Sequence, residues 1–161
     1  MQIEPRQFRD ALGGFCTGVT VVTTRAADGE LLGITASSFN SVSLAPPLVL
    51  FSLDRNAYSV AKFQQAGHFA VNVLAREQNE LCMRFARPLG DKWSGVDFEV
   101  WQTGAPILPG CVSNFDCRTY AIYDGGDHLI FLGEVLRMQT QPDLDPMIYY
   151  RGGFHGLTDD G

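Results

Sequence analysis

The chain has 161 residues, of which 45% are hydrophobic and 19% are charged, as expected for a single globular domain over 1–161. Its formal net charge of -6 argues against a nucleic-acid partner, because phosphate binding relies on a basic surface. No apolar run approaches the roughly 18 residues of a membrane span, and the polar N-terminus is unlike a signal peptide. The four cysteines (16, 82, 111 and 117) have no metal-type spacing and are typical of reduced thiols in a cytoplasmic protein, although Cys111 and Cys117 are near enough in sequence to be bridged.

Short helices and apolar strands alternate along the N-terminal half. Proline suits a first helical turn and glycine a stop, so a helix is predicted over 5–12. β-Branched residues predict a strand over 19–24, and Asp28-Gly29 turns the chain into a second strand over 32–38. Two further helices are predicted, one with Asn56 as its N-cap and one over 77–86. The remaining predicted strands cover 48–53, 69–74, 98–101, 111–123, 128–138 and 147–150.

This order of elements predicts a mainly β domain. Six or more strands joined by hairpins, with only short helices between them, favour a closed antiparallel barrel with helices on its outside. The segment from 88 to 109 is rich in glycine, proline and aromatic residues and is predicted as a long surface excursion.

The stretch 33–53 is the most informative part of the sequence. Strand alternation places Leu32, Ile34 and Ala36 on a buried face and leaves Gly33, Thr35 and Ser37 on a face of small polar groups. Small hydroxyl and amide side chains continue to residue 43, before two prolines that cannot join a central ladder. This bend is either a cradle for a polar cofactor or an ordinary network of serine and threonine turns.

Familiar catalytic motifs are absent from the sequence: it contains no G-x-S-x-G, H-E-x-x-H, G-x-G-x-x-G or P-loop pattern. His128 follows a Gly-Gly-Asp turn at the mouth of a strand, where it either meets a ligand or bonds to Asp127. Asn56 and Ser59 at a helix start suit an anion, or simply cap the helix. Arg84, Arg87 and Lys92 form a basic cluster that either binds an anion or is a solvated helix end.

Several of these segments together resemble the flavin reductase-like family with an FMN-binding split barrel. The most specific match is TASSFNSVSLAPPLV at 35–49, followed by the G-D-H hairpin within 123–135. Looser matches are found at 8–24, 67–74 and 104–110, so the resemblance covers nearly the whole chain. The nearest members are short-chain flavin:NAD(P)H reductase components of two-component flavin-dependent monooxygenases.

The resemblance implies a fold, an activity and a partner. The fold is an antiparallel split β-barrel with short flanking helices. The activity is hydride transfer from NADH or NADPH to FMN or FAD, which supplies reduced flavin to a partner monooxygenase. The protein is expected to be a homodimer with the flavin site close to the partner subunit. Alternatives are a non-catalytic flavin-binding split-barrel module acting as a sensor or carrier, and a structural barrel without cofactor. A pyridoxamine-phosphate oxidase relative is disfavoured by the G-D-H hairpin.

Site residues follow from the matching positions. The isoalloxazine ring is expected against Thr35, Ala36, Ser37 and Ser38. The flavin phosphate is expected near Asn56 and Ser59, with help from Arg87 and Lys92. Many relatives carry serine in place of Asn56, so the chain departs from the family pattern at this phosphate position. The nicotinamide side is assigned to His128, the expected catalytic residue, with Tyr150 and Arg151 as further candidates.

Overall fold

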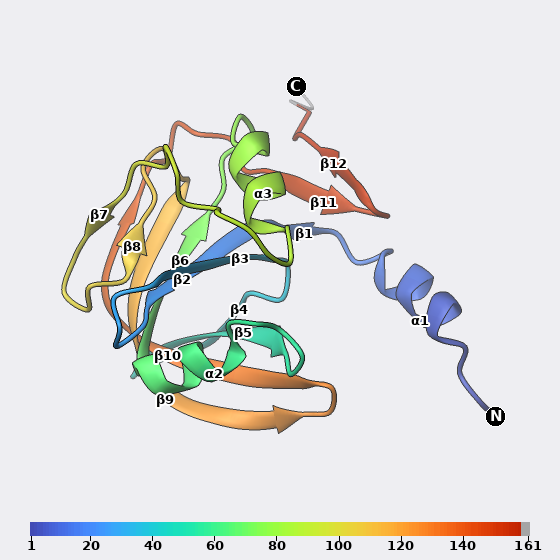
Figure 1. Ribbon diagram of the computed structural model, residues 1–161. Coiled ribbons are helices and arrows are strands. Elements are labelled where there is room, and N and C mark those ends of the chain that lie inside the picture. Colours follow the sequence, from blue (N-terminus) through green and yellow to red (C-terminus); the bar gives the residue numbers. More distant parts are fainter. Residues whose placement is uncertain (159–161) are drawn as a thin grey trace.

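A seven-stranded antiparallel sheet dominates the computed structural model, which describes residues 1–158 (Figure 1). The strand order is β3-β2-β6-β9-β10-β5-β4, and every pairing is antiparallel. Among the described residues, the edge strands β3 and β4 form no ladder with each other, so the barrel is split rather than closed. The strands are β2 (Thr20–Arg25), β3 (Leu31–Ala36), β4 (Asn40–Leu44), β5 (Pro47–Asp54), β6 (His68–Val73), β9 (Ser113–Gly125) and β10 (His128–Thr140).

Aromatic side chains fill the inside of the curled sheet. Phe51 lies 4.8 Å from Phe69 and 5.0 Å from Phe131 between ring centroids, and Phe63 packs edge-on against Phe51. All four rings are fully buried. Phe63 comes from α2 (Val60–Ala66), so this helix contributes to the barrel core. Such aromatic pairs add roughly 0.5–1.5 kcal/mol each beyond the area that they bury.

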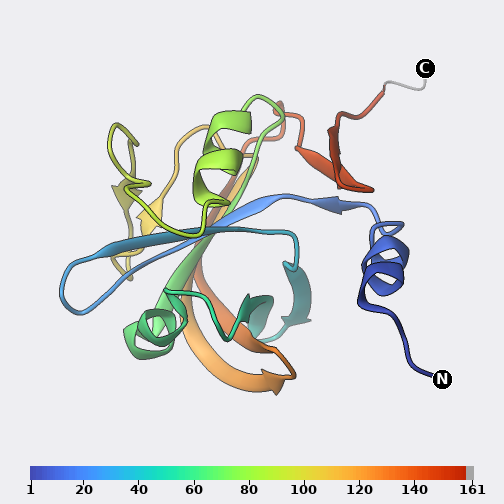
Figure 2. The ribbon, with the colours of Figure 1, turned by 45° about the vertical axis from the view of Figure 1, so that its right-hand side comes forward.

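The two helices of the barrel lie on opposite sides of β2 and β3 (Figures 1 and 2). α3 (Asn79–Phe85) packs on β2 and β3 through the buried side chains of Cys82 and Phe85, which belong to a second apolar cluster. β3 is therefore supported by a helix while its outer edge stays unpaired.

Buried amide groups fix the register of the central strands. Asn72 Nδ2 donates to Val21 O at 2.9 Å, while Asn72 Oδ1 accepts from Leu108 N and from Asn114 Nδ2. Both asparagines are fully buried. A slip of one residue would leave these groups without partners in the core, at a cost of about 1–3 kcal/mol for each.

Smaller elements lie beside the barrel. β1 (Thr17–Gly18), β11 (Ile148–Tyr150) and β12 (Gly153–His155) form a three-stranded sheet, and β7 (Glu99–Val100) pairs with β8 (Pro106–Ile107). The helix α1 (Pro5–Leu12) has no buried residue and stands away from the barrel in both views (Figures 1 and 2). No helix within 1–158 is long and apolar enough to cross a bilayer.

Several sequence predictions are confirmed and others are corrected. The mainly β antiparallel architecture and the first helix are as predicted. The helix predicted with Asn56 as its N-cap has Ser59 in that place and begins at Val60, because Asp54 Oδ1 accepts the Asn56 N–H at 2.7 Å and holds a local turn. The bend after residue 38 contains a strand, β4, and β1, β8 and β12 were not predicted. All four cysteines are free thiols.

Candidate functional site

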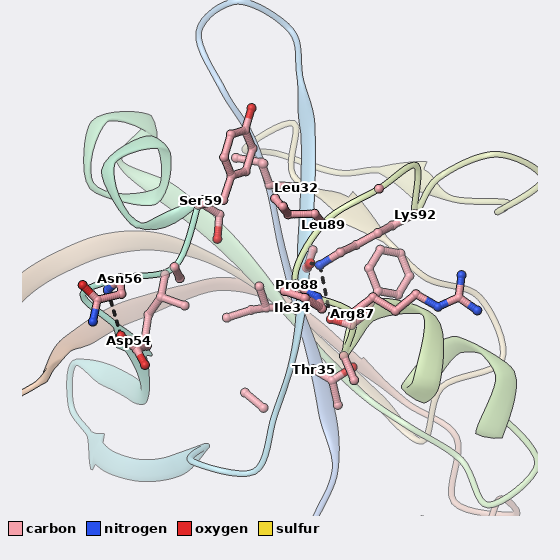
Figure 3. A pocket seen from close by; sticks show the side chains of 18 of the residues that line it. Leu32, Ile34, Thr35, Asp54, Asn56, Ser59, Arg87, Pro88, Leu89 and Lys92 are labelled. Carbon is pink, nitrogen blue, oxygen red and sulfur yellow. Dashed lines mark hydrogen bonds between the residues drawn. The ribbon is translucent and has the colours of Figure 1, made fainter.

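A cavity of about 1050 Å³ opens along β3. Four segments line it: β3 with the residues that follow it, the end of β5 with the turn to α2, the loop after α3, and the start of β10 (Figure 3). These segments bring together nine of the residues that the sequence singled out, namely Thr35, Ala36, Ser37, Ser38, Asn56, Ser59, Arg87, Lys92 and His128. Three others do not line this cavity: Tyr150 and Arg151 lie in β11 and the turn after it, and Arg84 of the basic cluster is bonded to Glu80 and Ser94 O instead.

The open edge of β3 presents backbone groups to the cavity. Gly33 O accepts a hydrogen bond from Lys92 Nζ at 3.2 Å, whereas Ala36 O accepts one from Thr20 Oγ1 of β2 at 2.8 Å. In an antiparallel strand, the N–H and C=O of one residue point the same way and the direction alternates along the strand. Gly33 and Thr35 therefore direct both of their main-chain groups away from β2, where a planar ligand can pair with them.

The side chains of β3 are arranged differently from the predicted open polar face. A Cβ atom on Gly33 would lie 2.6 Å from the Phe85 ring, so this position packs on α3. Thr35 Oγ1 donates to Cys82 O of the same helix at 2.6 Å. The cavity therefore meets the backbone of these residues, and the Thr35 hydroxyl is already used.

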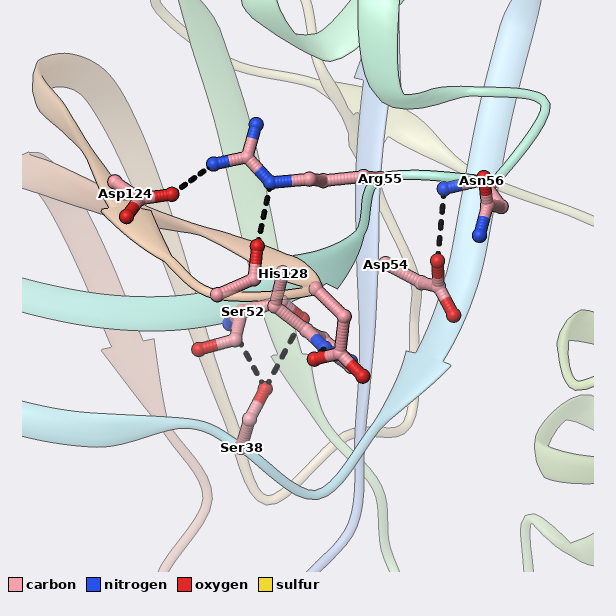
Figure 4. Close-up of polar contacts among 9 residues, drawn as sticks. Ser38, Ser52, Asp54, Arg55, Asn56, Asp124 and His128 are labelled. Atoms are coloured by element: carbon pink, nitrogen blue, oxygen red, sulfur yellow. Dashed lines mark hydrogen bonds and ion pairs between the residues drawn. The ribbon is translucent and has the colours of Figure 1, made fainter.

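Ser38 ties the end of β3 to β5 across the split (Figure 4). Its Oγ accepts a hydrogen bond from Ser52 N at 2.9 Å and lies 3.3 Å from Ser52 O, to which it donates. Ser37, in contrast, is exposed and lines the cavity. Within this serine pair, Ser38 holds the barrel together and Ser37 is the one whose side chain is free for a ligand.

Cationic and polar residues face each other across the cavity. Asn56 and Ser59 lie on one wall, and Arg87 and Lys92 come from the loop on the other (Figure 3). Lys92 Nζ donates to the carbonyl oxygens of Gly33 and Phe85, and burial lowers the pKa of its ammonium group. Arg87 is exposed. Since the Asn56 N–H is occupied by Asp54, an anion here would rely mainly on the two cations.

His128 is the first residue of β10 and lies opposite Asp54 in the register of β5 and β10. Its Nδ1 atom is 2.7 Å from Asp127 Oδ1, and this hydrogen bond lowers the pKa of the Asp127 carboxyl group. Nε2 has no hydrogen-bond partner among the described residues. The bond to Asp127 expected from the sequence is confirmed, and because His128 also lines the cavity, its contact with a ligand stays a prediction.

Sequence reasoning missed the aromatic part of the wall. Phe85, Leu89 and Trp93 line the cavity, and the rings of Phe85 and Trp93 lie 4.9 Å apart. The predicted surface excursion therefore begins as a wall of the cavity. The sequence did hold one signal for this wall, because Trp93 directly follows Lys92, which was expected to bind an anion.

These groups fit a flavin. An unpaired strand edge supplies alternating donors and acceptors for a planar ring with polar edges, and the apolar side chains of Ile34 and Leu89 line the same space. Lys92 and Arg87 supply positive charge for a phosphate. The cavity thus offers the three features that such a ligand needs: a polar edge, apolar contact and local cations.

Comparison with known proteins agrees with this geometry. A model of the flavin reductase like domain matches residues 12–158. The chain is 42% identical over 158 residues to the flavin-dependent monooxygenase reductase subunit HsaB of Rhodococcus jostii, covering 98% of this chain and 80% of that protein. It is 45% identical over 149 residues to FMN reductase (NADH) SmoA of Agrobacterium fabrum, covering 92% and 84%.

A solved structure has the same fold over almost its whole length. NADH:FAD oxidoreductase SgcE6 of Streptomyces globisporus, in complex with NAD and FAD fragments, gives a TM-score of 0.91 at 37% identity. The match covers 99% of this chain and 98% of that chain. The matched domain model and the identity to these relatives together show that the chain belongs to the flavin reductase-like family.

Proposed function

We propose that this protein is an NAD(P)H:flavin oxidoreductase that reduces FMN or FAD and supplies reduced flavin to a separate monooxygenase. The observation that carries the proposal is the open edge of β3, which borders a cavity whose lining includes nine residues expected from the sequence. The relatives support the same activity, since one is a monooxygenase reductase subunit and another is an FMN reductase (NADH). Four free thiols fit a cytoplasmic location, which is part of the proposal.

A flavin held in this cavity would supply the chemistry, with its N5 as the acceptor for the hydride on C4 of the nicotinamide. The protein's task is to hold the two rings at about 3–3.5 Å, a range in which orientation contributes roughly 7–11 kcal/mol. The backbone of Gly33 and Thr35 orients the flavin ring along β3, and Lys92 and Arg87 neutralise its phosphate. Lys92 also places positive charge beside β3, where it stabilises negative charge that develops on a ring held there.

His128 is assigned to the nicotinamide side of the cavity. Its Nδ1 atom is fixed by Asp127, so the ring has one defined orientation and offers Nε2 to a ligand. A neutral or charged imidazole at this position binds and orients the nicotinamide. No proton needs to pass through it for hydride transfer.

Loss of absorbance at 340 nm when NADH or NADPH is mixed with protein and FMN or FAD tests the activity directly. Flavin binding without nucleotide oxidation would favour the non-catalytic sensor or carrier. Unquenched flavin fluorescence would favour a barrel without cofactor.

The His128 assignment is tested by His128→Ala, which is expected to impair NAD(P)H use more than flavin binding. His68→Gln is a matched control, because His68 lies outside the cavity. An unchanged KM and kcat in His128→Ala would remove this residue from the site.

A homodimer is the further part of the proposal. Isolated helices shorter than roughly 12–15 residues are marginal in water, yet α1 has eight residues and contacts nothing that buries its side chains. Phe8 and Leu12 are 53% and 56% exposed, and Phe15 just beyond the helix is 78% exposed. These three apolar side chains are the surface that a second copy of the chain is expected to cover.

Sedimentation velocity tests the dimer. The unaltered protein is expected to sediment as a dimer, and Phe8→Glu as a monomer or a weaker dimer. Arg6→Glu changes charge on the same helix and serves as the control. A monomeric unaltered protein would refute this part of the proposal.

A further inference from the structure

Arg55 lies in the turn between β5 and α2, and it does not line the cavity. Its contacts all go to one place, the tip of the β9–β10 hairpin (Figure 4). Nε donates to Gly126 O at 2.7 Å, the guanidinium group pairs with the Asp124 carboxylate, and the backbone N–H donates to Asp127 O at 3.0 Å. One residue thus binds three of the four residues that immediately precede His128.

Strand pairing holds the hairpin to β5 as far as His128, which lies opposite Asp54, and the tip extends beyond this ladder. Gly125 pairs with His128, so the loop consists of Gly126 and Asp127, with Gly126 at a φ of +77°. A positive φ at the first loop position is the pattern of a type II′ turn. The side chain of Asp127 is hydrogen-bonded to His128 Nδ1 on the same hairpin, so it does not connect the tip to the rest of the barrel.

The Arg55 contacts restrain the hairpin tip because they act together. Its side chain is 43% exposed and that of Asp124 is 79% exposed, and an ion pair this open is weak by itself. The guanidinium fork, however, engages a carbonyl and a carboxylate at the same time, which fixes direction as well as distance. Together with the main-chain bond, it leaves the tip few ways to move relative to β5.

We propose that Arg55 is a positioning residue for His128: it clamps the hairpin tip to the β5–α2 turn and so sets where the imidazole meets the nicotinamide. This inference rests on the proposed function, in which His128 binds that ring. Arg55 itself touches neither ligand. It acts on pyridine nucleotide use through His128 and leaves the flavin-binding wall of β3 and Lys92 unchanged.

The test compares four variants of the full chain, Arg55→Met, Arg55→Lys, His128→Ala and Arg55→Met with His128→Ala, with NADH and FMN as ligands. In Arg55→Met the KM for NADH is expected to rise about tenfold with a smaller fall in kcat, because displacement of an orienting group weakens productive binding. The dissociation constant for FMN is expected to stay within about twofold, since no flavin contact is lost. Arg55→Lys is expected to have a KM for NADH between those of the unaltered protein and Arg55→Met, because lysine keeps the positive charge but lacks the forked guanidinium group.

Arg118→Met is the matched control. Arg118 pairs with Glu134 at 2.6 Å on the same hairpin, ten residues before His128 and away from its tip. The Arg118→Met substitution removes one surface ion pair of the same kind, so the KM for NADH is expected to stay unchanged. Hydrogen exchange over 124–130 in flavin-free protein gives a readout independent of activity: Arg55→Met is expected to speed it and Arg118→Met to leave it unchanged.

The double variant separates the two claims. If Arg55 acts through His128, adding Arg55→Met to His128→Ala costs nothing more in KM. If the effects of the two substitutions on KM add, or if Arg55→Met has a normal KM while His128→Ala is impaired, the Arg55 proposal is overturned and the assignment of His128 stands. A normal His128→Ala overturns the assignment of His128 and the Arg55 proposal with it. Asp124→Asn removes only the carboxylate partner and is expected to raise KM in the same direction by less, which covers the case in which Arg55→Met does not fold.

Discussion

Gly33 offers a direct test of how the cavity edge is built. A Cβ atom added at this position would lie 2.6 Å from both Cδ1 and Cε1 of Phe85 and 3.3 Å from Cζ2 of Trp93. Phe85 is 1% exposed and is held edge-on by Trp93, so its ring has no open space into which it can swing. Overpacking of this kind costs about 1–3 kcal/mol, so we expect Gly33→Ala to lower stability by that amount. For a chain of this size, each kcal/mol lowers the Tm by about 2–4 °C.

The same substitution is expected to affect the ligand. Relief of the contact requires β3 to move away from α3, and β3 carries the backbone groups that border the cavity. Flavin affinity should therefore fall along with stability. Urea unfolding followed by tryptophan fluorescence measures the first effect, and titration of FMN measures the second.

Two further variants control this experiment. Gly18→Ala adds the same methyl group where nothing lies within 4 Å, and it is expected to be neutral or slightly stabilising. Phe85→Leu combined with Gly33→Ala is expected to cost less than the sum of the two single changes, with a coupling of about 0.5–3 kcal/mol. A Gly33→Ala protein with unaltered urea midpoint and unaltered FMN affinity would refute the reasoning.

Three other predictions concern the cavity and its surroundings. Ser37→Trp places an indole in the cavity and is expected to lower flavin affinity about 5- to 150-fold in a fluorescence titration, since overpacking costs about 1–3 kcal/mol; retained affinity would mean that the ring lies elsewhere. Lys92→Met keeps the length of the side chain without its charge, and the loss of FMN affinity is expected to shrink as salt is added; equal losses at low and high salt would argue against an ionic contact. Burial raises the pKa of the Cys111 thiol from 9.0 to about 11, so the unfolded chain loses this proton at a lower pH than the folded protein. The free energy of unfolding is therefore expected to fall as the pH rises from 9 to 11, by up to about 1.4 kcal/mol per pH unit. Urea midpoints of Cys111→Ala across this range should show a shallower decline, and an equal slope would contradict the assignment.

The fold class could be predicted because each strand carries its own local signal. β2 and β5 contain runs of β-branched or large apolar residues, and their interior positions are buried as the pattern indicates. β4 gave no such signal, since an edge strand of the sequence NSVSL buries little and needs no apolar face. β1 has only two residues and is defined by its long-range pairing with β11, which local sequence does not encode.

The sequence predicted much of the polar lining of the cavity, but not its aromatic wall or the contacts of its side chains. Nine expected residues meet in one cavity, yet the hydroxyls of Thr35 and Ser38 turn out to bond to the main chain of Cys82 and Ser52. A sequence shows that a hydroxyl is present but not which neighbour uses it. Arg55 is a similar case, because its partners lie about 70 positions further along the chain.

The unpaired edge of β3 is also a hazard for the protein when no ligand covers it. An exposed strand edge is a template on which another chain can add a strand, and proteins commonly guard such edges with lysine or proline. Here the ammonium group of Lys92 caps the carbonyl of Gly33, and at the opposite edge Pro46 and Pro47 stand at the turn between β4 and β5. Flavin would complete this protection, so protein stored without it should aggregate sooner than the same protein stored with it.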